Sequence, residues 1–342
     1  MLTFNSLSYL YYRPKHGFLR HLATNTLRML QSLLTLGCVT RRDPEEWKIP
    51  KLAKHHRHLA EIGEVRTIPP TSADIPLLPN VQVVVDRGVV KPEPRPGFMI
   101  APKSTPKEKI WSRAKPGEKA IFYIIGGGYQ MGQPVQWFVT WELATRLGLR
   151  IFRPMLDYLA AWDYMVTELG FEPQLDEQGF KRLGLPGAVF ASAPWCDVTG
   201  SFPSISRNAH KPSFSRHYSY PAQRDPLMSP AFALKSDRHF ARLSEKGVKM
   251  HVDYGEDEKL HDEVEATVGI MRNQGLEVDA LEYVFARTPI KFWPGIGFSW
   301  PIVAEATERL VRETWPKHVI PGEGVIRALQ EEKDIKEGKV KK

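Results

Sequence analysis

The chain has 342 residues, a formal net charge of +8 and an apolar fraction of 42%. These values are typical of a globular protein with one large core, and they exclude a fibrous repeat or a mostly disordered chain. No apolar run approaches the roughly 18 residues that a membrane-spanning helix needs. The longest run, Leu30 to Val39, is interrupted by polar residues, so we expect no transmembrane span.

The positive charge is concentrated at the two ends of the chain. Residues 1–42 contain six basic residues and no Asp or Glu, and residues 326–342 form a lysine-rich tail. Basic and aromatic residues do not interleave along one segment, so we expect no nucleic-acid partner. The acid-free start is typical either of a helical cap with a basic face, able to touch a membrane surface, or of a mitochondrial presequence. We expect a cytoplasmic protein, with the mitochondrion as the alternative.

The sequence predicts neither a metal site nor a cofactor. The two cysteines, Cys38 and Cys196, form no C-x-x-C pair, and no Cys/His cluster with zinc-ligand spacing occurs. Histidines 55, 56 and 58 lie beside basic residues and are typical of a basic helix face. No glycine-rich segment ends in the GK[ST] of a phosphate loop.

The first 115 residues are predicted to form a helical cap and a proline-rich connector. Leucines at 27, 30, 33 and 34 have the spacing of an amphipathic helix, and a second helix is predicted over residues 47–62. Prolines recur from Pro69 to Pro116, which excludes a continuous helix there. Within this connector, Val81–Val85 is predicted to be a strand.

From residue 116, short apolar strands alternate with helices. Strands are predicted over 120–125, 149–153, 187–193, 248–254 and 278–285, and helices over 140–147, 156–169, 258–274 and 302–314. This alternation predicts the α/β class, with a doubly wound, mostly parallel sheet. The predicted organisation is a helical cap and connector over 1–115, an α/β core over 116–325 and a basic tail over 326–342.

Three glycines, Gly126, Gly127 and Gly128, directly follow the first strand of this predicted core. Glycines at a strand end allow the backbone to present successive N–H groups to a negatively charged oxygen. The segment therefore predicts an oxyanion-binding turn.

Four segments in the same order resemble the hormone-sensitive-lipase branch of the α/β-hydrolase esterases, fungal esterases above all. The glycine run continues to Tyr129 and is similar to the oxyanion turn of that family. Ala193–Asp197 resembles its Ser-Pro-Trp-x-Asp segment, and Asp225–Pro230 its Asp-Pro-x-x-Ser-Pro segment. Gly255–Glu263 is similar to the turn that carries the catalytic acid.

The resemblance covers about residues 115–315 and implies an α/β-hydrolase fold without a cofactor. It places the catalytic acid at Glu258, with Asp257 and Asp262 as competing carboxylates. It also implies a carboxylesterase-like or lipase-like hydrolase of small apolar esters, in a setting such as fungal secondary-metabolite or toxin biosynthesis.

The nucleophile and the histidine of that family are missing from the sequence. No G-x-S-x-G occurs, and residues 171–186, where the nucleophile elbow belongs, contain no serine and no apolar strand. The histidine loop instead contains Gly297 and Phe298. A second gap falls at Arg153-Pro154, where relatives carry a longer Tyr-Arg-Leu-Ala-Pro-type stretch. The sheet is therefore predicted to be truncated, without the nucleophile strand and its elbow.

Two hypotheses about function follow. The first is an ester hydrolase by descent; Ser299, in a G-x-S-x-P segment, is its one substitute nucleophile, although it more simply occupies the histidine loop by default. The second is a catalytically inactive remnant, a binding or scaffold protein, or a truncated gene model. Ser192 is interpreted as a hydrogen-bonded core serine and His251 as a packing residue of a strand.

Overall fold

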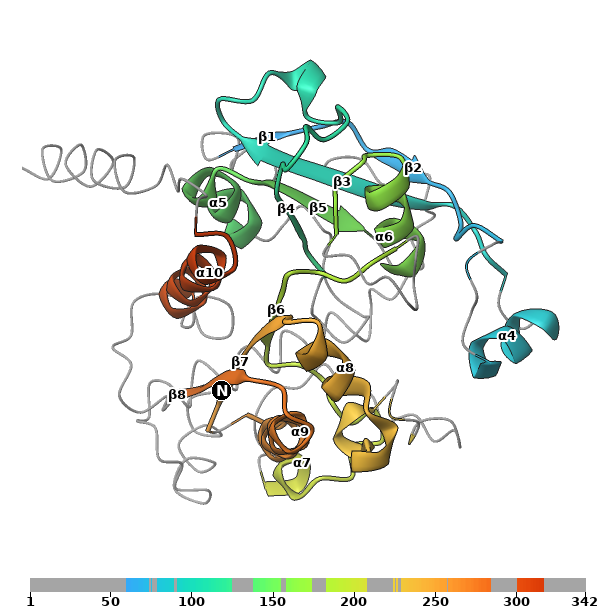
Figure 1. Cartoon of the computed structure of the whole chain (residues 1–342), viewed down its shortest axis with the longest axis vertical. Coiled ribbons are helices and arrows are strands. Elements are labelled where there is room, and N and C mark those ends of the chain that lie inside the picture. Colours follow the sequence, from blue (N-terminus) through green and yellow to red (C-terminus); the bar gives the residue numbers. More distant parts are fainter. Residues whose placement is uncertain are drawn as a thin grey trace, which may run out of the picture. The chain divides into compact units, whose positions relative to one another are not determined.

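The computed structural model describes residues 60–73, 75, 79–88, 91–124, 138–154, 158–173, 183–207, 224, 226, 229–256, 258–283 and 300–316. The chain divides into two compact units (Figure 1). The first unit comprises Arg42–Leu185 and His318–Lys342, and the second comprises Met1–Arg41 and Pro186–Lys317. The helices predicted before residue 60 and the basic tail lie outside the described residues.

The first unit is built on a mixed sheet with the strand order β1-β3-β5-β4, in which β2 also pairs with β3 (Figure 1). The strands are β1 (Ala60–Ile62), β2 (Arg66–Ile68), β3 (Arg95–Pro102), β4 (Ala120–Phe122) and β5 (Arg150–Pro154). β3 is antiparallel to β1, β2 and β5, whereas β4 and β5 are parallel. The helices are α4 (Pro79–Asp86), η2 (Lys107–Lys109), α5 (Phe138–Leu147) and α6 (Tyr158–Thr167).

β5 is buried along its whole length, so its alternating side chains meet helices on both faces. On one face Phe152 is fully buried and packs with Met99 of β3 and with Ala161 and Met165 of α6. Arg153 points to the other face, where its guanidinium contacts Thr140 of α5. The sheet is thus covered by α6 on one side and by α5 on the other.

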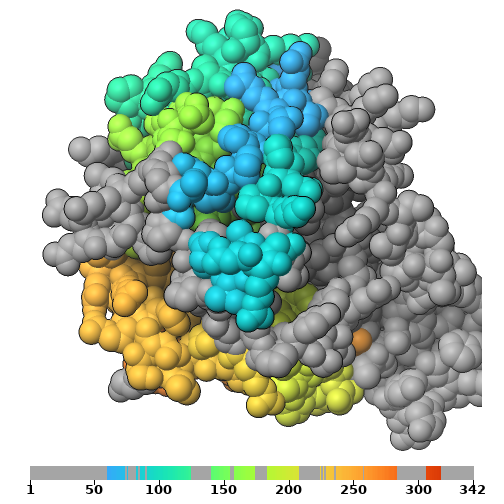
Figure 2. Space-filling view, turned by 90° about the vertical axis from the view of Figure 1, so that its right-hand side faces the viewer, coloured from blue at the N-terminus to red at the C-terminus, as the bar shows by residue number. Residues whose placement is uncertain are grey.

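The predicted strand at Val81–Val85 is wrong, because this segment is helix α4. Local signals decide the outcome: Pro79 opens the helix, Gly88 follows its end with φ of 67°, and the Gln82 amide donates to Asp86 at 2.7 Å. The β-branched valines carry only a weak preference for strand. The helix lies at the surface, seen in cyan in Figure 2, where 45% of Val83 is exposed.

The predicted helix over residues 47–62 is wrong at its end, because Ala60–Ile62 is strand β1. The proline-rich connector also contains the eight-residue strand β3, which the sequence did not predict. Its prolines sit near the ends of the strand, at Pro96 and Pro102, where few ladder hydrogen bonds are lost. The mixed sheet therefore takes strands from both sides of residue 115.

The second unit contains the three-stranded parallel sheet β6-β7-β8. The strands are β6 (Ala188–Ser192), β7 (Lys249–Gly255) and β8 (Val278–Tyr283), and the helices are α7 (Pro203–Arg207), η4 (Pro230–Phe232), η5 (Lys235–Asp237), α8 (His239–Glu245), α9 (His261–Asn273) and α10 (Trp300–Thr314). The strands predicted over 120–125, 149–153, 187–193, 248–254 and 278–285 and the helices predicted over 140–147, 156–169, 258–274 and 302–314 are confirmed, with shifted ends.

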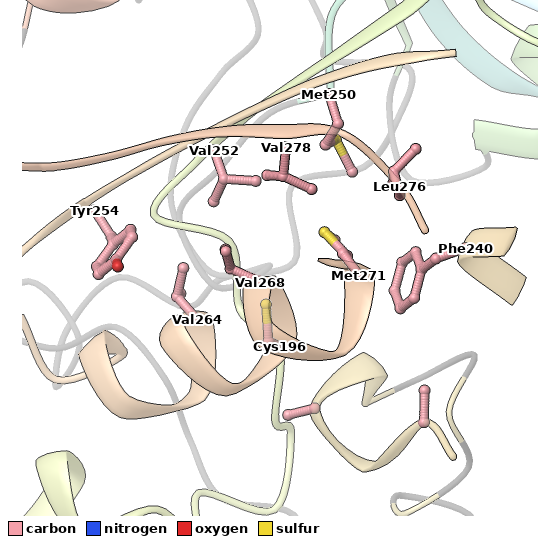
Figure 3. Packing of buried hydrophobic residues seen from close by; sticks show 12 residues of the cluster. Cys196, Phe240, Met250, Val252, Tyr254, Val264, Val268, Met271, Leu276 and Val278 are labelled. Carbon is pink, nitrogen blue, oxygen red and sulfur yellow. The ribbon is translucent and has the colours of Figure 1, made fainter. Parts of the chain in front are cut away.

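The core of the second unit lies between the sheet and α9 (Figure 3). Met250, Val252 and Val278 project from the strands toward α9. From α9, Val264, Val268 and Met271, which recur at helical spacing, pack against these strand residues. Helix α10 contacts β6 and β7, and its Arg309 pairs with Asp279 of β8.

Candidate active site

The predicted catalytic acid, Glu258, lies in the turn between β7 and α9. The turn begins at the carboxyl end of a parallel strand, the edge at which α/β proteins bind ligands. The Glu258 N–H donates to the Gly255 carbonyl at 3.0 Å, and the side chain is half-buried. Ser204 of α7 fixes the turn from outside, because its hydroxyl donates to the Lys259 carbonyl at 2.8 Å.

Segments that resemble family motifs are hydrogen-bonded to one another in the second unit. The Val198 N–H donates to the Ser229 hydroxyl at 3.0 Å, and the Ala231 N–H donates to the Cys196 carbonyl at 3.1 Å. The carboxylate of Glu263 accepts from the Cys196 N–H at 2.7 Å, which ties the acid turn to the same place. These hydrogen bonds join the three segments to one another.

Asp197 organises the turn that follows β6. Its buried carboxylate accepts hydrogen bonds from the backbone N–H and the hydroxyl of both Thr199 and Ser201. Burial acts to raise the pKa of Asp197, but these hydrogen bonds outweigh it and lower the pKa below its usual value. Asp197 is therefore held as an anion and acts as a turn clamp.

The pKa values of Glu263 and Cys196 are raised, whereas that of Asp197 is lowered. Burial raises the pKa of Glu263 to about 8, against the hydrogen bonds from the Asp197 and Cys196 N–H groups, which lower it. Burial likewise raises the pKa of the free Cys196 thiol to about 12. A thiol held protonated in this way is a poor nucleophile, so Cys196 does not replace the missing serine.

A second polar group lies at the carboxyl end of β6 and β7. The exposed Ser192 hydroxyl donates to Asp253 Oδ1 at 2.6 Å, and burial raises the pKa of Asp253. His251 is buried, stacks on Phe190 with ring centroids 4.9 Å apart, and pairs with Asp279 at 2.7 Å. Ser192 is therefore hydrogen-bonded, as predicted, although exposed and not in the core, and His251 is a packing residue as predicted.

His261 is the histidine nearest to Glu258 along the chain, and other carboxylates hold its ring. Its Nδ1 lies 2.9 Å from Asp262 and its Nε2 lies 2.9 Å from Glu282. Burial acts to lower the pKa of His261, and the two carboxylates outweigh it and raise the pKa. Asp262 also pairs with Arg207, with one nitrogen–oxygen distance of 2.5 Å. Both Asp262 and His261 are thus engaged in an ion-pair network between α7, α9 and β8.

Other predicted site residues lie outside the described part of the chain: Gly126, Gly127 and Gly128, Asp257 and Ser299. In the ranges that the structure covers, no three His, Cys, Asp or Glu side chains are arranged so that they could hold a metal ion. In those ranges no helix is long and apolar enough to cross a membrane.

Comparison with known proteins gives a likeness in structure only. No protein-family model and no curated protein sequence matches the chain. Among solved structures, a fungal esterase from Rhizomucor miehei superposes with a TM-score of 0.50 and 13% identity, over 83% of this chain and 96% of that one. A hormone-sensitive lipase from a metagenome library gives 0.48 and 15%, over 85% and 98%. EstE5, soaked with p-nitrophenyl butyrate, gives 0.47 and 16%, over 84% and 98%.

The chain has the α/β-hydrolase fold, as the resemblance in sequence implies. At this level of identity the likeness concerns the fold and leaves the chemistry to the residues of the site. Sequence reasoning missed the roles of Asp197 and Glu263. For Asp197 the available signal was the turn-forming Thr199-Gly200-Ser201 that follows it, whereas no local signal marked Glu263.

Proposed function

We propose that the chain is, by descent, a carboxylesterase-like or lipase-like hydrolase whose ligands are small apolar esters. One observation supports this proposal: Glu258 lies in the turn between β7 and α9 of an α/β-hydrolase fold, the turn that the resemblance in sequence assigns to the catalytic acid. In a serine hydrolase this acid orients a histidine and stabilises its charged form. The glycine turn Gly126–Gly128 is the proposed oxyanion site.

A second candidate, a non-catalytic ligand-binding protein of the same descent, is favoured by the side chains themselves. Acyl transfer requires a nucleophile, a base and an oxyanion site within mutual reach. The sequence contains no G-x-S-x-G, and no histidine between residues 285 and 317. Ser192 is bonded to Asp253, and His261 is held by Asp262 and Glu282. In the described residues, this serine and this histidine are thus each bonded to carboxylates other than Glu258.

Two assays on the purified full chain separate the candidates. An active hydrolase is expected to cleave p-nitrophenyl butyrate and to form a covalent adduct with a fluorophosphonate probe. The binding protein is expected to do neither while still binding a non-hydrolysable ester analogue. Loss of ester binding as well would remove support for both.

The transcript offers an independent check on the two gaps. We expect the coding sequence to lack the nucleophile elbow between residues 171 and 186, as the protein sequence does. A transcript that encodes G-D-S-A-G there would restore the enzyme interpretation.

A further inference from the structure

Arg153 brings a positive charge into the interior of the first unit. It is the fourth residue of β5, with no exposed surface, and its register partner on β3 is the buried Phe98. Its guanidinium carbon lies 5.0 Å from the ring centre of Tyr123, the residue after β4. Because β4 and β5 are parallel, their carboxyl ends meet at one edge of the sheet, the edge at which α/β proteins bind ligands.

Only one edge of this guanidinium is satisfied. Nη1 donates to the hydroxyl of Thr140 at 2.9 Å. Nε and Nη2 are buried and make no hydrogen bond, and no carboxylate among the described residues pairs with them. These two nitrogens form one side of the planar group, a side whose two N–H bonds match both oxygens of a carboxylate.

Arg150 of the same strand shows how this protein otherwise treats a buried arginine. Its Nε donates to the Glu118 carboxylate at 2.8 Å, and its Nη1 donates to the carbonyls of Ile110 and Ser112 at 3.1 and 2.6 Å. Only 5% of Arg150 is exposed. The two arginines are similarly buried, and the Nη2 of each is without a hydrogen bond. Among the described residues, however, only Arg150 has a carboxylate on its Nε.

We propose that the Nε–Nη2 edge of Arg153 is an anion-binding site that takes the carboxylate of a small aliphatic acid. A buried cation without a counter-ion is unfavourable, and an anion that reaches it interacts in a medium of low dielectric constant. Phe98 and the Tyr123 ring supply apolar surface beside the charge, which suits a short aliphatic tail.

The charge of Arg153 persists at neutral pH. Burial lowers the pKa of Arg153 to about 10, while Tyr123 acts to raise it. The site goes beyond the proposed function, because binding of a carboxylate requires no nucleophile. The proposed ligand, a small aliphatic acid, nonetheless corresponds to the acid part of the esters in the proposed function.

Calorimetric titration of the full chain at neutral pH tests the site. We expect saturable binding of sodium butyrate and none of butyramide, a neutral molecule of almost the same shape. Arg153→Gln should weaken butyrate binding about tenfold or more, the usual effect of losing a hydrogen bond to a charged group. Association should be slow, because the buried side chain requires a local opening before the ligand enters.

Arg150→Gln is the matched control, since it removes the other buried arginine of β5 and should leave the butyrate affinity unchanged. If Arg153→Gln fails to fold, Arg153→Lys serves, because lysine keeps the charge without the planar fork and should also bind butyrate more weakly. Equal binding of butyrate and butyramide, no binding of either, or unaltered affinity in both Arg153 variants would overturn the site. Inorganic phosphate binding in place of butyrate would overturn the carboxylate assignment. None of these outcomes depends on ester hydrolysis or on labelling by the fluorophosphonate probe. A failure of the Arg153 site can therefore be distinguished from a failure of the proposed function.

Discussion

The two units differ in how their buried titratable groups are hydrogen-bonded. In the second unit, the buried carboxylates of Asp197, Glu263 and Asp253 accept hydrogen bonds from neighbouring backbone or hydroxyl groups. In the first unit, Arg153 is buried with an unbonded edge, as far as the described residues show. Each of these carboxyl groups is bonded through at least one oxygen, although Glu263 Oε2 and Asp253 Oδ2 have no hydrogen-bond partner. Arg153 instead leaves two adjacent nitrogens unbonded, and this is the edge at which we propose that a ligand binds. The difference distinguishes polar groups that stabilise the fold from the edge of Arg153 at which we propose that a ligand binds.

The sheets also differ in how deeply their aromatic residues are buried. Replacing one aromatic residue of each sheet with alanine should therefore lower the free energy of unfolding by different amounts. Phe152 of β5 is fully buried between Trp111, Phe122 and Tyr164, so Phe152→Ala should reduce the free energy of unfolding by about 3–5 kcal/mol. Phe190 of β6 is only half-buried, so Phe190→Ala should cost about 1–2 kcal/mol. Urea denaturation of both variants measures the two costs. Equal losses would contradict the described difference in burial.

The hydrogen-bonded carboxylate of Asp197 gives the next largest expected effect. Asp197→Ala removes the acceptor of two backbone N–H groups and two hydroxyls, and should lower the stability by roughly 2–3 kcal/mol. Asp197→Asn keeps one acceptor oxygen and should cost less. Thermal and urea unfolding compare the two, and an alanine variant as stable as the asparagine variant would show that the turn does not depend on this acceptor.

The pH dependence of stability should depend on Glu263. Its folded pKa is raised from 4.5 to about 8, so the folded state binds the proton more tightly than the unfolded state. Its contribution to stability is fully present below the unfolded pKa and is lost as pH rises through about 8. Glu263→Gln should flatten the decline in stability between these values, measured by urea unfolding at several pH values.

His261 needs a control in that experiment, because its raised pKa acts in the same direction. Its contribution is present below the unfolded pKa of 6.5 and is lost as pH rises through the higher folded value. The Glu263→Gln comparison is therefore best made in a His261→Gln background. A decline that persists unchanged in the double variant would rule out both groups as its source.

Much of the α/β alternation could be predicted from the sequence, because buried parallel strands and amphipathic helices have distinct apolar patterns. The errors fell where pairing partners are distant or local caps dominate. β3 contains two prolines and is recognisable only beside β1 and β5. In α4, Pro79 and Gly88 outweighed a run of valines.

The candidate site was predictable in part and for a physical reason. Glu258 stands on the expected turn because a strand end and a helix start are local features. The hydrogen bonds of Glu263 to Cys196 and Asp197 join residues more than sixty positions apart, and no local pattern reveals such a partner. The unbonded edge of Arg153 is likewise visible only when both faces of β5 are known.

We propose that the α/β-hydrolase fold persists here without the nucleophile and the base of the family that the sequence resembles. Incubation of the purified full chain with a fluorophosphonate probe, followed by intact-mass measurement, tests it most directly. We expect no stoichiometric adduct, because the chain has no G-x-S-x-G and the described histidine nearest to Glu258 is held by Asp262 and Glu282. A stoichiometric adduct on one serine, lost in Glu258→Gln, would contradict the claim and establish a working triad.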